Sequence, residues 1–270
     1  MTKVATGRRA QNRVNRNSEL ILAANEIIRT EGLEALTMQA VAARVGCAVG
    51  TIYTYFDSKS DLLSVLQVAA METLFATFER SHQSWDQAIS EAELDLASAA
   101  VVRLVASSRV FIALGEHHPR EFELLQMMIS AREYPTKAVD QDEVLPVALA
   151  LLNMLMVFIE EAILAGALLA PATDPVTGEI RSTDSSLSRT IRWAGGINGA
   201  LLVSNVGTYE DDRITALFDG QRLALSLADD LLLGWGASRD ALEAAFIFID
   251  HLAASGQLIQ LAEEAVVDLT

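Results

Sequence analysis

Residues 37–59, with the sequence TMQAVAARVGCAVGTIYTYFDSK, decide the fold of the N-terminal part of this 270-residue chain. Their apolar side chains recur at the i, i+3, i+4, i+7 spacing that is typical of an amphipathic helix. The two runs are Met38, Val41, Ala42 and Val45, and then Val49, Ile52, Tyr53 and Phe56. Gly46 separates the runs, and Thr37 precedes the first as a capping residue. The stretch predicts two short helices joined by a tight turn, the helix-turn-helix arrangement whose second helix enters the major groove of DNA.

Helical patterns lie on both sides of this stretch. On its N-terminal side, apolar spacing predicts a helix that begins at Asn17 or Ser18 and stops at Gly32. On its C-terminal side, Ser58 with Asp61 resembles a capping box that has aspartate in place of glutamate. This box predicts the start of a long helix that runs to about residue 80.

The outer face of the second short helix is small and rich in hydroxyl groups. If Val49, Ile52 and Phe56 face the core, the opposite face presents Ala48, Thr51, Thr54 and Tyr55. Gly50 costs about 1 kcal/mol relative to alanine inside a helix. Close approach of the backbone to DNA, or of this helix to the preceding one, would offset that cost. The alternative is an ordinary helical hairpin whose tyrosines lie at the surface.

The net charge of the chain is unevenly distributed. The whole chain has 36 acidic and 20 basic side chains, a formal charge of −16. Residues 1–66 hold eight basic and six acidic side chains, so they carry +2 and the rest of the chain carries −18. Five of the basic residues fall within the first sixteen positions, which hold no acid, and we interpret these positions as a flexible basic arm. Such an arm beside a compact module can supply the positive footprint that DNA binding needs.

The remainder of the chain is predicted to be helical. Its hydrophobic content of 51% excludes a disordered polymer, and only five prolines and fifteen glycines argue against a turn-rich β fold. Polar segments at 133–143 and 171–186 interrupt the helical patterns. The predicted helices are 88–116, 119–132, 143–169, 186–207, 213–234 and 238–255. We therefore expect an all-α protein with two domains: a three-helix DNA-binding domain with its arm at 1–66, and a larger helical bundle for ligand binding and dimerisation at 67–270.

We expect a cytoplasmic protein without a membrane span. The N-terminus lacks the apolar region of a secretory signal. In the apolar segment 144–170, Glu160 and Glu161 argue against insertion into lipid and favour a helix that is buried on most sides. The single cysteine, Cys47, is consistent with a reducing compartment, and we interpret it as a small buried hydrophobe rather than a redox sensor.

The sequence contains no enzyme signature. His117 and His118 precede Pro119 without a third ligand at a familiar metal spacing, so we interpret the pair as a surface helix end. The chain has no phosphate-cradling glycine loop, nucleophile elbow or CxxC motif. We expect no catalytic residues, no metal and no cofactor.

Residues 17–66 resemble the TetR family of bacterial transcriptional regulators. The residues that carry the resemblance occur in order and at the family's spacing: Thr37, Ala42, Gly46, Gly50, Tyr53, Phe56, Lys59, Leu62 and Leu63. The match covers about a quarter of the chain. It departs from the family at Cys47-Ala48, where members usually have Val-Ser and the serine caps the second short helix. The loss of a cap typically costs about 1 kcal/mol.

The resemblance implies a role in DNA binding for particular residues. Thr37 would cap its helix and touch a phosphate, while Thr51 and Tyr55 would face DNA. Tyr53 would donate its hydroxyl to a phosphate while its ring packs, and Lys59 would contact the DNA backbone. Arg9, Arg13 and Arg16 lie where family members have an arm that enters the minor groove. The candidate DNA-binding residues are Arg9, Arg13, Arg16, Thr37, Ala48, Gly50, Thr51, Tyr53, Thr54, Tyr55 and Lys59.

The resemblance also implies that the rest of the chain binds a small-molecule effector and forms a homodimer. A dimer would bind a palindromic operator, because one helix-turn-helix reads too few base pairs. We expect helices 186–207 and 213–234 to form the dimer interface. Small residues would allow close helix contact there, or would serve packing within one subunit: Gly195, Gly196, Gly199 and Ala200. The chain is longer than is usual for the family, by the loop at 171–186 and a helix after Gly236.

An effector chamber is predicted from apolar and polar side chains of the body, although each apolar side chain taken alone favours ordinary core. The apolar candidates are Phe111, Leu114, Phe122, Met127, Met128, Met154, Phe158 and Trp193. The polar candidates are Asn153, Glu160, Arg192 and Asn198. Buried carboxylates at 160 and 161 would need a partner, either a cationic ligand or Arg192.

The leading functional hypothesis is a ligand-responsive regulator, most often a repressor in this family. A largely apolar effector would weaken DNA binding through a shift of population, with a coupling of about 1–3 kcal/mol. The alternative is an all-α ligand-binding or protein-interaction module of the same fold that does not bind an operator.

Overall fold

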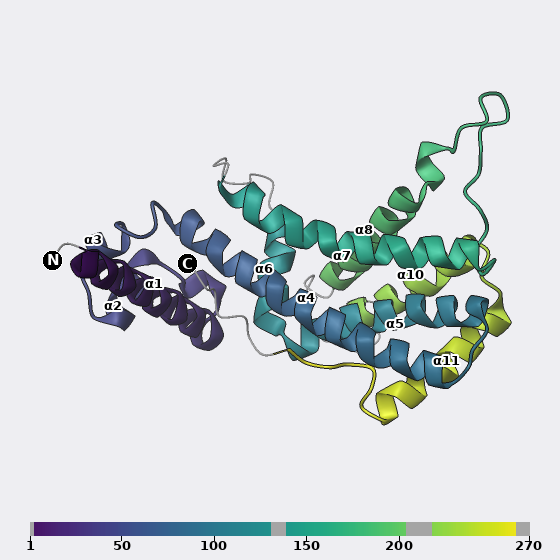
Figure 1. The fold of residues 1–270 in the computed structure, drawn as a ribbon, viewed down its shortest axis with the longest axis horizontal. Coiled ribbons are helices and arrows are strands. Elements are labelled where there is room, and N and C mark those ends of the chain that lie inside the picture. The colour runs from purple at the N-terminus through teal and green to yellow at the C-terminus, as the bar shows by residue number, and fades with distance from the viewer. Residues whose placement is uncertain (1–2, 131–138, 204–217, 263–270) are drawn as a thin grey trace. The chain divides into compact units, whose positions relative to one another are not determined.

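The computed structural model describes residues 3–130, 139–203 and 218–262. Within these ranges the protein is helical and forms no β-strand, which confirms the all-α prediction (Figure 1). The α-helices are α1 (Lys3–Glu31), α2 (Met38–Val45), α3 (Val49–Ile52), α4 (Lys59–Glu91), α5 (Leu96–His117), α6 (Pro119–Ser130), α7 (Val139–Leu164), α8 (Ser186–Leu202), α10 (Gly220–Gly234) and α11 (Arg239–Ala254). Two short 3₁₀ turns are η1 (Leu33–Ala35) and η2 (Ser182–Asp184).

The contacts within the chain divide it into two units. The N-terminal unit comprises the described residues within 1–73 and 119–147, and the body comprises those within 74–118 and 148–262. α4 supplies residues to both units, with Leu62 and Leu66 in the N-terminal core and Trp85 and Ile89 in the core of the body. The domain boundary predicted after Leu66 falls inside this continuous helix and stays a prediction.

α1 begins at Lys3 rather than at residue 17 or 18, so the predicted flexible arm is wrong where the structure describes it. Residues 3–16 contain no proline, and arginine, alanine and glutamine favour helix. Once the buried side chains of Leu20, Ala24 and Ile27 nucleate the helix, propagation toward the N-terminus adds one hydrogen bond per residue at little cost.

α4 continues to Glu91, well past the predicted end near residue 80. Its last three turns bury Trp85 completely and Ile89 almost completely, so packing extends the helix. The predicted helix 88–116 is therefore wrong at its start. Glu93 adopts a positive φ of 52° in the turn, and Asp95 then caps α5 by accepting hydrogen bonds from the backbone N–H of Ala97 and Ser98 at 3.0 Å each.

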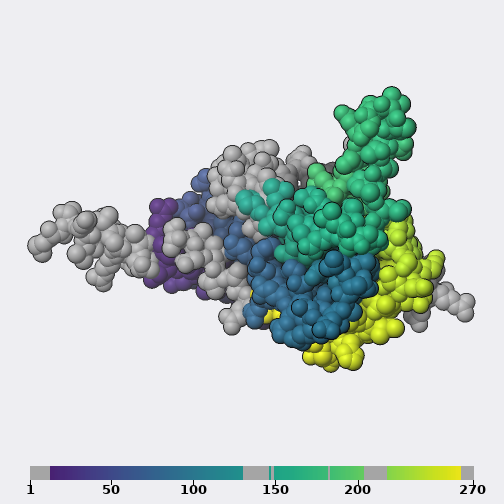
Figure 2. All heavy atoms as spheres, turned by 45° about the vertical axis from the view of Figure 1, so that its right-hand side comes forward, coloured from purple at the N-terminus to yellow at the C-terminus, as the bar shows by residue number. Residues whose placement is uncertain are grey.

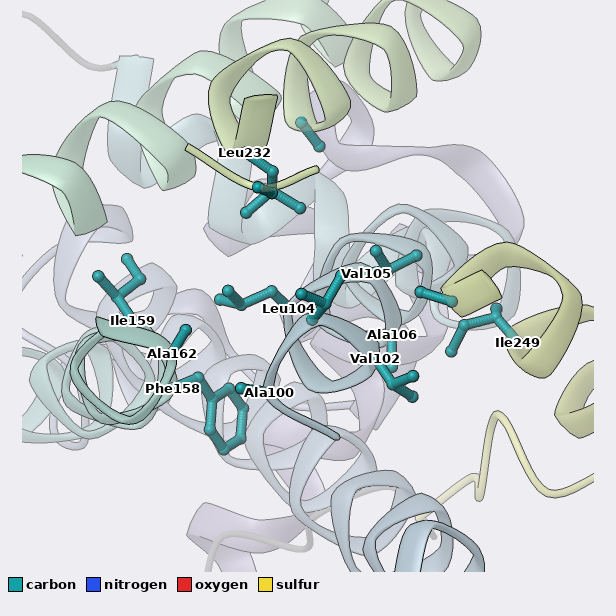
Figure 3. Close-up of a cluster of buried hydrophobic side chains, with 14 of the residues drawn as sticks. Ala100, Val102, Leu104, Val105, Ala106, Phe158, Ile159, Ala162, Leu232 and Ile249 are labelled. Carbon is teal, nitrogen blue, oxygen red and sulfur yellow. The ribbon is translucent and has the colours of Figure 1, made fainter. Parts of the chain in front are cut away.

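α5 lies at the centre of the body. Figure 3 shows its side chains reaching α7 on one side and α11 on another, with α10 above. The labelled contacts are Ala100, Val102, Leu104, Val105 and Ala106 of α5, Phe158, Ile159 and Ala162 of α7, Leu232 of α10 and Ile249 of α11. α4 and α5 each have an 18-residue window apolar enough to cross a membrane, but 61% of each window is buried inside the protein, as in a core helix. For the segment that we tested from the sequence, 144–170, the absence of a membrane span stays a prediction.

α7 differs from its prediction in bounds and burial. It runs from Val139 to Leu164, includes Pro146, and ends before the predicted residue 169. Residues 139–143 of the predicted polar interruption belong to the helix, while 131–138 lie outside the described residues. The expectation of burial on most sides is wrong, because the outer face is exposed at Leu149, Val157 and Leu164. Glu160 and Glu161 are exposed as well, so they are not the buried carboxylates that we predicted.

The predicted loop between α7 and α8 is present. Residues 171–181 project from the body, with one isolated bridge between Thr173 and Ile180 (Figures 1 and 2). Asp184 anchors the end of this loop, because its carboxylate accepts hydrogen bonds from the Ala172 backbone N–H at 2.7 Å and the Arg189 side chain at 3.0 Å. Arg189 is buried and also donates to the carbonyl of Leu169 at 2.9 Å.

The C-terminal part ties α4 to the end of the described chain. α11, the helix that we assigned to the extra length, packs on α5. After it, the backbone N–H groups of Gln260 and Ala262 donate to the buried hydroxyls of Ser81 and Thr77 at 2.9 and 3.1 Å. Thr77 also lies 2.9 Å from Nε2 of His118. His118 is therefore buried, whereas His117 is exposed at the last position of α5, so the predicted surface helix end holds for His117 alone.

Candidate DNA-binding surface and effector groove

The helix-turn-helix has the local geometry that its sequence predicts. Thr37 caps α2 through its hydroxyl, which accepts a hydrogen bond from the Ala40 backbone N–H at 3.0 Å. Gly46 ends α2 with a φ of 69°, a left-handed conformation that glycine adopts without strain. Ala48 occupies the capping position of α3 and makes no side-chain hydrogen bond, which confirms the missing cap.

α3 presents the predicted small surface. Ile52 and Phe56 are buried, whereas Ala48, Gly50 and Thr54 are exposed. A Cβ added at Gly50 would meet no protein atom within 4 Å, and its φ is not positive. Neither packing of α3 against α2 nor backbone conformation therefore requires glycine at this position. Close approach of DNA is the remaining explanation of those that we considered.

The two tyrosines differ from expectation in their exposure. The side chain of Tyr53 is half exposed, and Tyr55 is partly buried against the N-terminal core. The reason is the way α3 ends. The N–H groups of Thr54 and Tyr55 donate to the carbonyls three residues earlier, at 3.1 and 2.9 Å. In such a 3₁₀ turn residues i and i+3 eclipse, so Tyr55 lies over the buried Ile52.

The basic candidates lie on α1 and α4. Arg9, Arg13 and Arg16 follow the i, i+4, i+7 spacing, which places these positions on one face of the helical segment that replaces the predicted arm. Arg13 is exposed and Arg16 pairs with Glu19 at 2.7 Å; the side chain of Arg9 lies outside the described part. Lys59 is exposed at the first position of α4. Neither Arg13 nor Lys59 forms an ion pair with a described residue.

A groove of about 470 Å³ lies in the body between α4, α5 and α7. We call it the effector groove, and its size falls in the range of small-molecule sites. It contains three of the predicted chamber residues, Asn153, Met154 and Phe158. It also contains Glu161, which the sequence singled out as a charge in an apolar segment, and further residues that the sequence did not indicate. The full lining is Phe75, His82, Asp86, Arg103, Ala150, Asn153, Met154, Val157, Phe158 and Glu161.

Arg103 joins the three helices of the groove. Its Nε and one terminal nitrogen donate to Oδ1 of Asp86 on α4 at 2.8 and 2.5 Å. Its other terminal nitrogen lies 3.9 Å from Oε2 of Glu161 on α7, beyond hydrogen-bond distance. The side chains are 22% exposed for Arg103, 43% for Asp86 and 49% for Glu161. Arg103 thus pairs directly with α4 and only loosely with α7.

His82 and Phe158 of the groove lining pack against each other and against the buried Trp85, which does not line the groove. The His82 ring lies 4.9 Å from that of Phe158, and Trp85 meets both edge-on at centroid distances of 5.7 and 6.4 Å. Burial lowers the pKa of His82 below its usual 6.5; nearby Asp86 raises it, Arg103 lowers it, and Glu161 and Glu79 raise it less. The imidazole is therefore neutral at pH 7.

Several chamber candidates lie elsewhere. Phe111 and Trp193 pack edge-to-face in the core at 6.4 Å, and Arg192 pairs with Asp184 at 3.6 Å rather than with a glutamate of α7. The amide nitrogen of Asn198 donates to the Ala194 carbonyl at 3.1 Å. Glu160 is exposed and does not line the groove. Four further candidates are not groove residues either: Leu114 on α5, and Phe122, Met127 and Met128 on α6 of the N-terminal unit.

The missed groove residues carried a weak sequence signal. Arg103 is a charged residue inside an apolar run, the same kind of signal that drew attention to Glu160 and Glu161. Asp86 stands in a polar stretch of α4, where apolar spacing does not mark it. Among the described residues, no three His, Cys, Asp or Glu side chains lie close enough to hold a metal.

The glycines of α8 separate into two roles. A Cβ at Gly196 would lie 2.8 Å from Cδ2 of Leu227, so this glycine allows α8 to pack on α10 of the same subunit. Gly195 and Gly199 meet no atom within 4 Å and lie on an exposed face. Leu187 and Ile191 continue that face at a spacing of four residues, and we call these four residues the α8 stripe. Ala200 packs against the core of the body.

Comparison with known proteins places the helix-turn-helix in a family. Residues 20–66 match the model of bacterial regulatory proteins of the tetR family. No curated protein matches the sequence. Among solved structures, a protein of unknown function from Rhodococcus sp. RHA1 is 16% identical, with 81% of this chain and 94% of that one covered and a TM-score of 0.50. This likeness concerns the fold.

Two further structures are similar at lower TM-scores. The transcriptional regulator FadR from Bacillus subtilis, in complex with stearoyl-CoA, is 21% identical over 80% of this chain and 97% of its own, with a TM-score of 0.48. RolR in complex with resorcinol is 17% identical over 95% and 100%, with a TM-score of 0.47. The family match confirms the resemblance found in the sequence: residues 20–66 are similar to the helix-turn-helix region of bacterial regulatory proteins of the tetR family.

Proposed function

We propose that the protein is a homodimeric, ligand-responsive repressor that releases a palindromic operator when a small molecule binds the effector groove. The observation that carries this proposal is the course of α4. The helix begins at Lys59, beside the helix-turn-helix, and its distal half supplies His82 and Asp86 to the groove. A change at the groove therefore acts on the same helix that holds the DNA-binding unit.

In the proposed complex, the outer face of α3 approaches the major groove, with Thr54 exposed and Thr51 half-buried. Thr51 and Thr54 supply hydroxyls for base edges, and Tyr53 reaches a phosphate. Arg13, Arg16 and Lys59 contribute phosphate contacts that depend on salt but carry no sequence information. Tyr55 supports α3 from the core side instead of facing DNA.

The α8 stripe supports the proposed dimer. In a two-fold interface the same face of both subunits meets, and small residues let helix backbones approach closely. Leu187 and Ile191 would bury apolar area, while Gly195 and Gly199 would sit where the partner's helix crosses. α8 and α10 are the described parts of the predicted interface helices; residues 204–217 lie outside the described residues.

A ligand that regulates DNA binding must bind two arrangements of the protein with different affinity. A coupling of about 1–3 kcal/mol would change operator affinity about 5- to 150-fold. The proposal places the protein in the cytoplasm, with DNA, an effector and a second copy as partners. It involves no enzymatic activity, metal or cofactor.

One observation favours a second candidate, a module of the same fold that does not bind an operator. Ala48 leaves α3 without a side-chain cap and removes a hydroxyl at the helix start. The net charge of −18 on residues 67–270 adds electrostatic repulsion from DNA. Measured affinity for DNA decides between the two candidates.

The test is a fluorescence anisotropy titration of the full protein with DNA from its own promoter region, at two salt concentrations. The repressor proposal predicts affinity that prefers this sequence and falls with salt. Thr51→Ala with Thr54→Ala should weaken binding to the operator but not to unrelated DNA. Thr30→Ala on α1 is a matched control, because this exposed hydroxyl, like that of Thr54, donates to a nearby carbonyl of its own segment. Equal affinity for operator and unrelated DNA would support the second candidate.

A further inference from the structure

The effector groove carries an unbalanced negative charge. Asp86 and Glu161 are carboxylates, Arg103 is the only cation in its lining, and His82 is neutral at pH 7. The lining therefore carries a net charge of −1. Because Arg103 already donates twice to Asp86, the guanidinium is committed to that partner.

The carboxylate of Glu161 is the group that this arrangement leaves unsatisfied. It lies 3.9 Å from Arg103, and it accepts no hydrogen bond from the described residues. About half of its surface is exposed, so solvent can reach the carboxylate. A ligand that fills the groove removes this solvent, and a covered carboxylate needs a new partner.

The apolar part of the groove lies next to this carboxylate. Phe158 is buried and presents a ring, and Met154 and Val157 occupy neighbouring positions on the same helix as Glu161. A cation placed near an aromatic face gains further attraction from the ring quadrupole. The groove thus combines one available negative charge with an apolar and aromatic surface.

The three classes of ligand charge have different consequences here. An anion could reach only the remaining terminal nitrogen of Arg103, and it would face repulsion from both Asp86 and Glu161. A neutral ligand would cover Glu161 without pairing it. A monocation would pair with Glu161 and neutralise the lining, so it alone satisfies every charge. We propose, building on the proposed function of this groove, that its ligand is a monovalent organic cation with an apolar or aromatic body, such as an amphiphilic amine.

The test compares three fluorescent probes of similar shape with the full protein: naphthylmethyl-trimethylammonium, its neutral carbon isostere neopentylnaphthalene, and the anion naphthylmethanesulfonate. Fluorescence anisotropy gives the dissociation constants. We expect the cation to bind about ten times more tightly than either other probe. Tighter binding of the anion or of the neutral probe, or no binding of the cation, would overturn the inference.

Variants locate the contact. Glu161→Gln should weaken binding of the cation about tenfold and leave the neutral probe unchanged. Glu160→Gln is the matched control, because Glu160 is an exposed carboxylate on the same helix that does not line the groove. Equal losses in the two variants would show non-specific attraction and refute the site. Because these assays contain no DNA, cation binding without operator binding would refute the proposed function and leave this inference intact.

Discussion

Replacement of Gly50 by alanine is expected to stabilise the protein and to weaken its binding to DNA. Gly50 lies in α3 with an ordinary helical φ, and a Cβ there meets no protein atom within 4 Å. The substitution therefore introduces no clash and no strain. It removes backbone freedom from the unfolded chain and improves helix propensity, which is worth about 0.5–1 kcal/mol.

The effect on DNA binding has the opposite sign. If the backbone of α3 approaches DNA at Gly50, a methyl group at this exposed position occupies space that the DNA needs. Loss of one close contact of about 1.4 kcal/mol corresponds to a tenfold rise in the dissociation constant. The other explanation that we considered for a glycine at position 50, close packing of α3 on α2, predicts a loss of stability in Gly50→Ala instead.

Urea unfolding followed by circular dichroism measures the first effect, and anisotropy with operator DNA measures the second. Gly234→Ala on α10 is a matched control, since Gly234 is also exposed in a helix with open space around it. This control should gain stability without losing DNA affinity. Unchanged DNA affinity in Gly50→Ala would refute the reasoning about close approach, and a loss of stability would refute the reasoning about open space.

Three further predictions follow from the structure. Ala48→Ser should restore the cap of α3 and raise the free energy of unfolding by about 1 kcal/mol in urea titrations, and no gain would mean that α3 does not need the cap. The pKa of His82 is lowered in the folded state, so acidification below pH 6.5 protonates the unfolded chain first and lowers the free energy of unfolding. His82→Phe should therefore flatten the pH dependence of the melting temperature below pH 6.5. Ile191→Lys in the α8 stripe should produce monomers in size-exclusion chromatography and weaken operator binding, whereas Leu149→Lys, at a site of similar exposure on α7 (52% against 55%), should do neither.

The sequence predicted the parts of the structure that local interactions determine. The spacing of Met38 and Val41, the cap at Thr37 and the turn at Gly46 all act within one or two helical turns, and the structure has each of them. The exposures of the two tyrosines differ from those that apolar periodicity predicts, because the change from α-helix to 3₁₀ turn after Ile52 rotates the chain. The roles of both tyrosines in DNA binding stay predictions.

Most of the effector groove could not be predicted from the sequence, because its residues are far apart along the chain. Asp86 and Arg103 are 17 positions apart, and Glu161 lies on a third helix. Helical periodicity identifies which face of a helix is apolar, but it does not identify the neighbouring helix. For the same reason Trp193 and Asn198 were reasonable candidates from their residue types, yet they lie in the core instead of the groove.

The unequal pairing of Arg103 supplies a physical basis for regulation. A ligand shifts an equilibrium only by the difference between its affinities for the two states. Arg103 of α5 is hydrogen-bonded to Asp86 of α4, whereas Glu161 of α7 lies 3.9 Å away. The ion pair between α5 and α4 is therefore stronger than the ion pair between α5 and α7. A cation that binds Glu161 therefore weakens the Arg103–Glu161 ion pair first and leaves the Arg103–Asp86 hydrogen bonds in place. It follows that a state with Arg103 and Glu161 in direct contact would bind the cation less well, because Arg103 and the cation would compete for the same carboxylate. Since Arg103 is also hydrogen-bonded to Asp86 of α4, a change in its position would act on α4, as the proposed function requires.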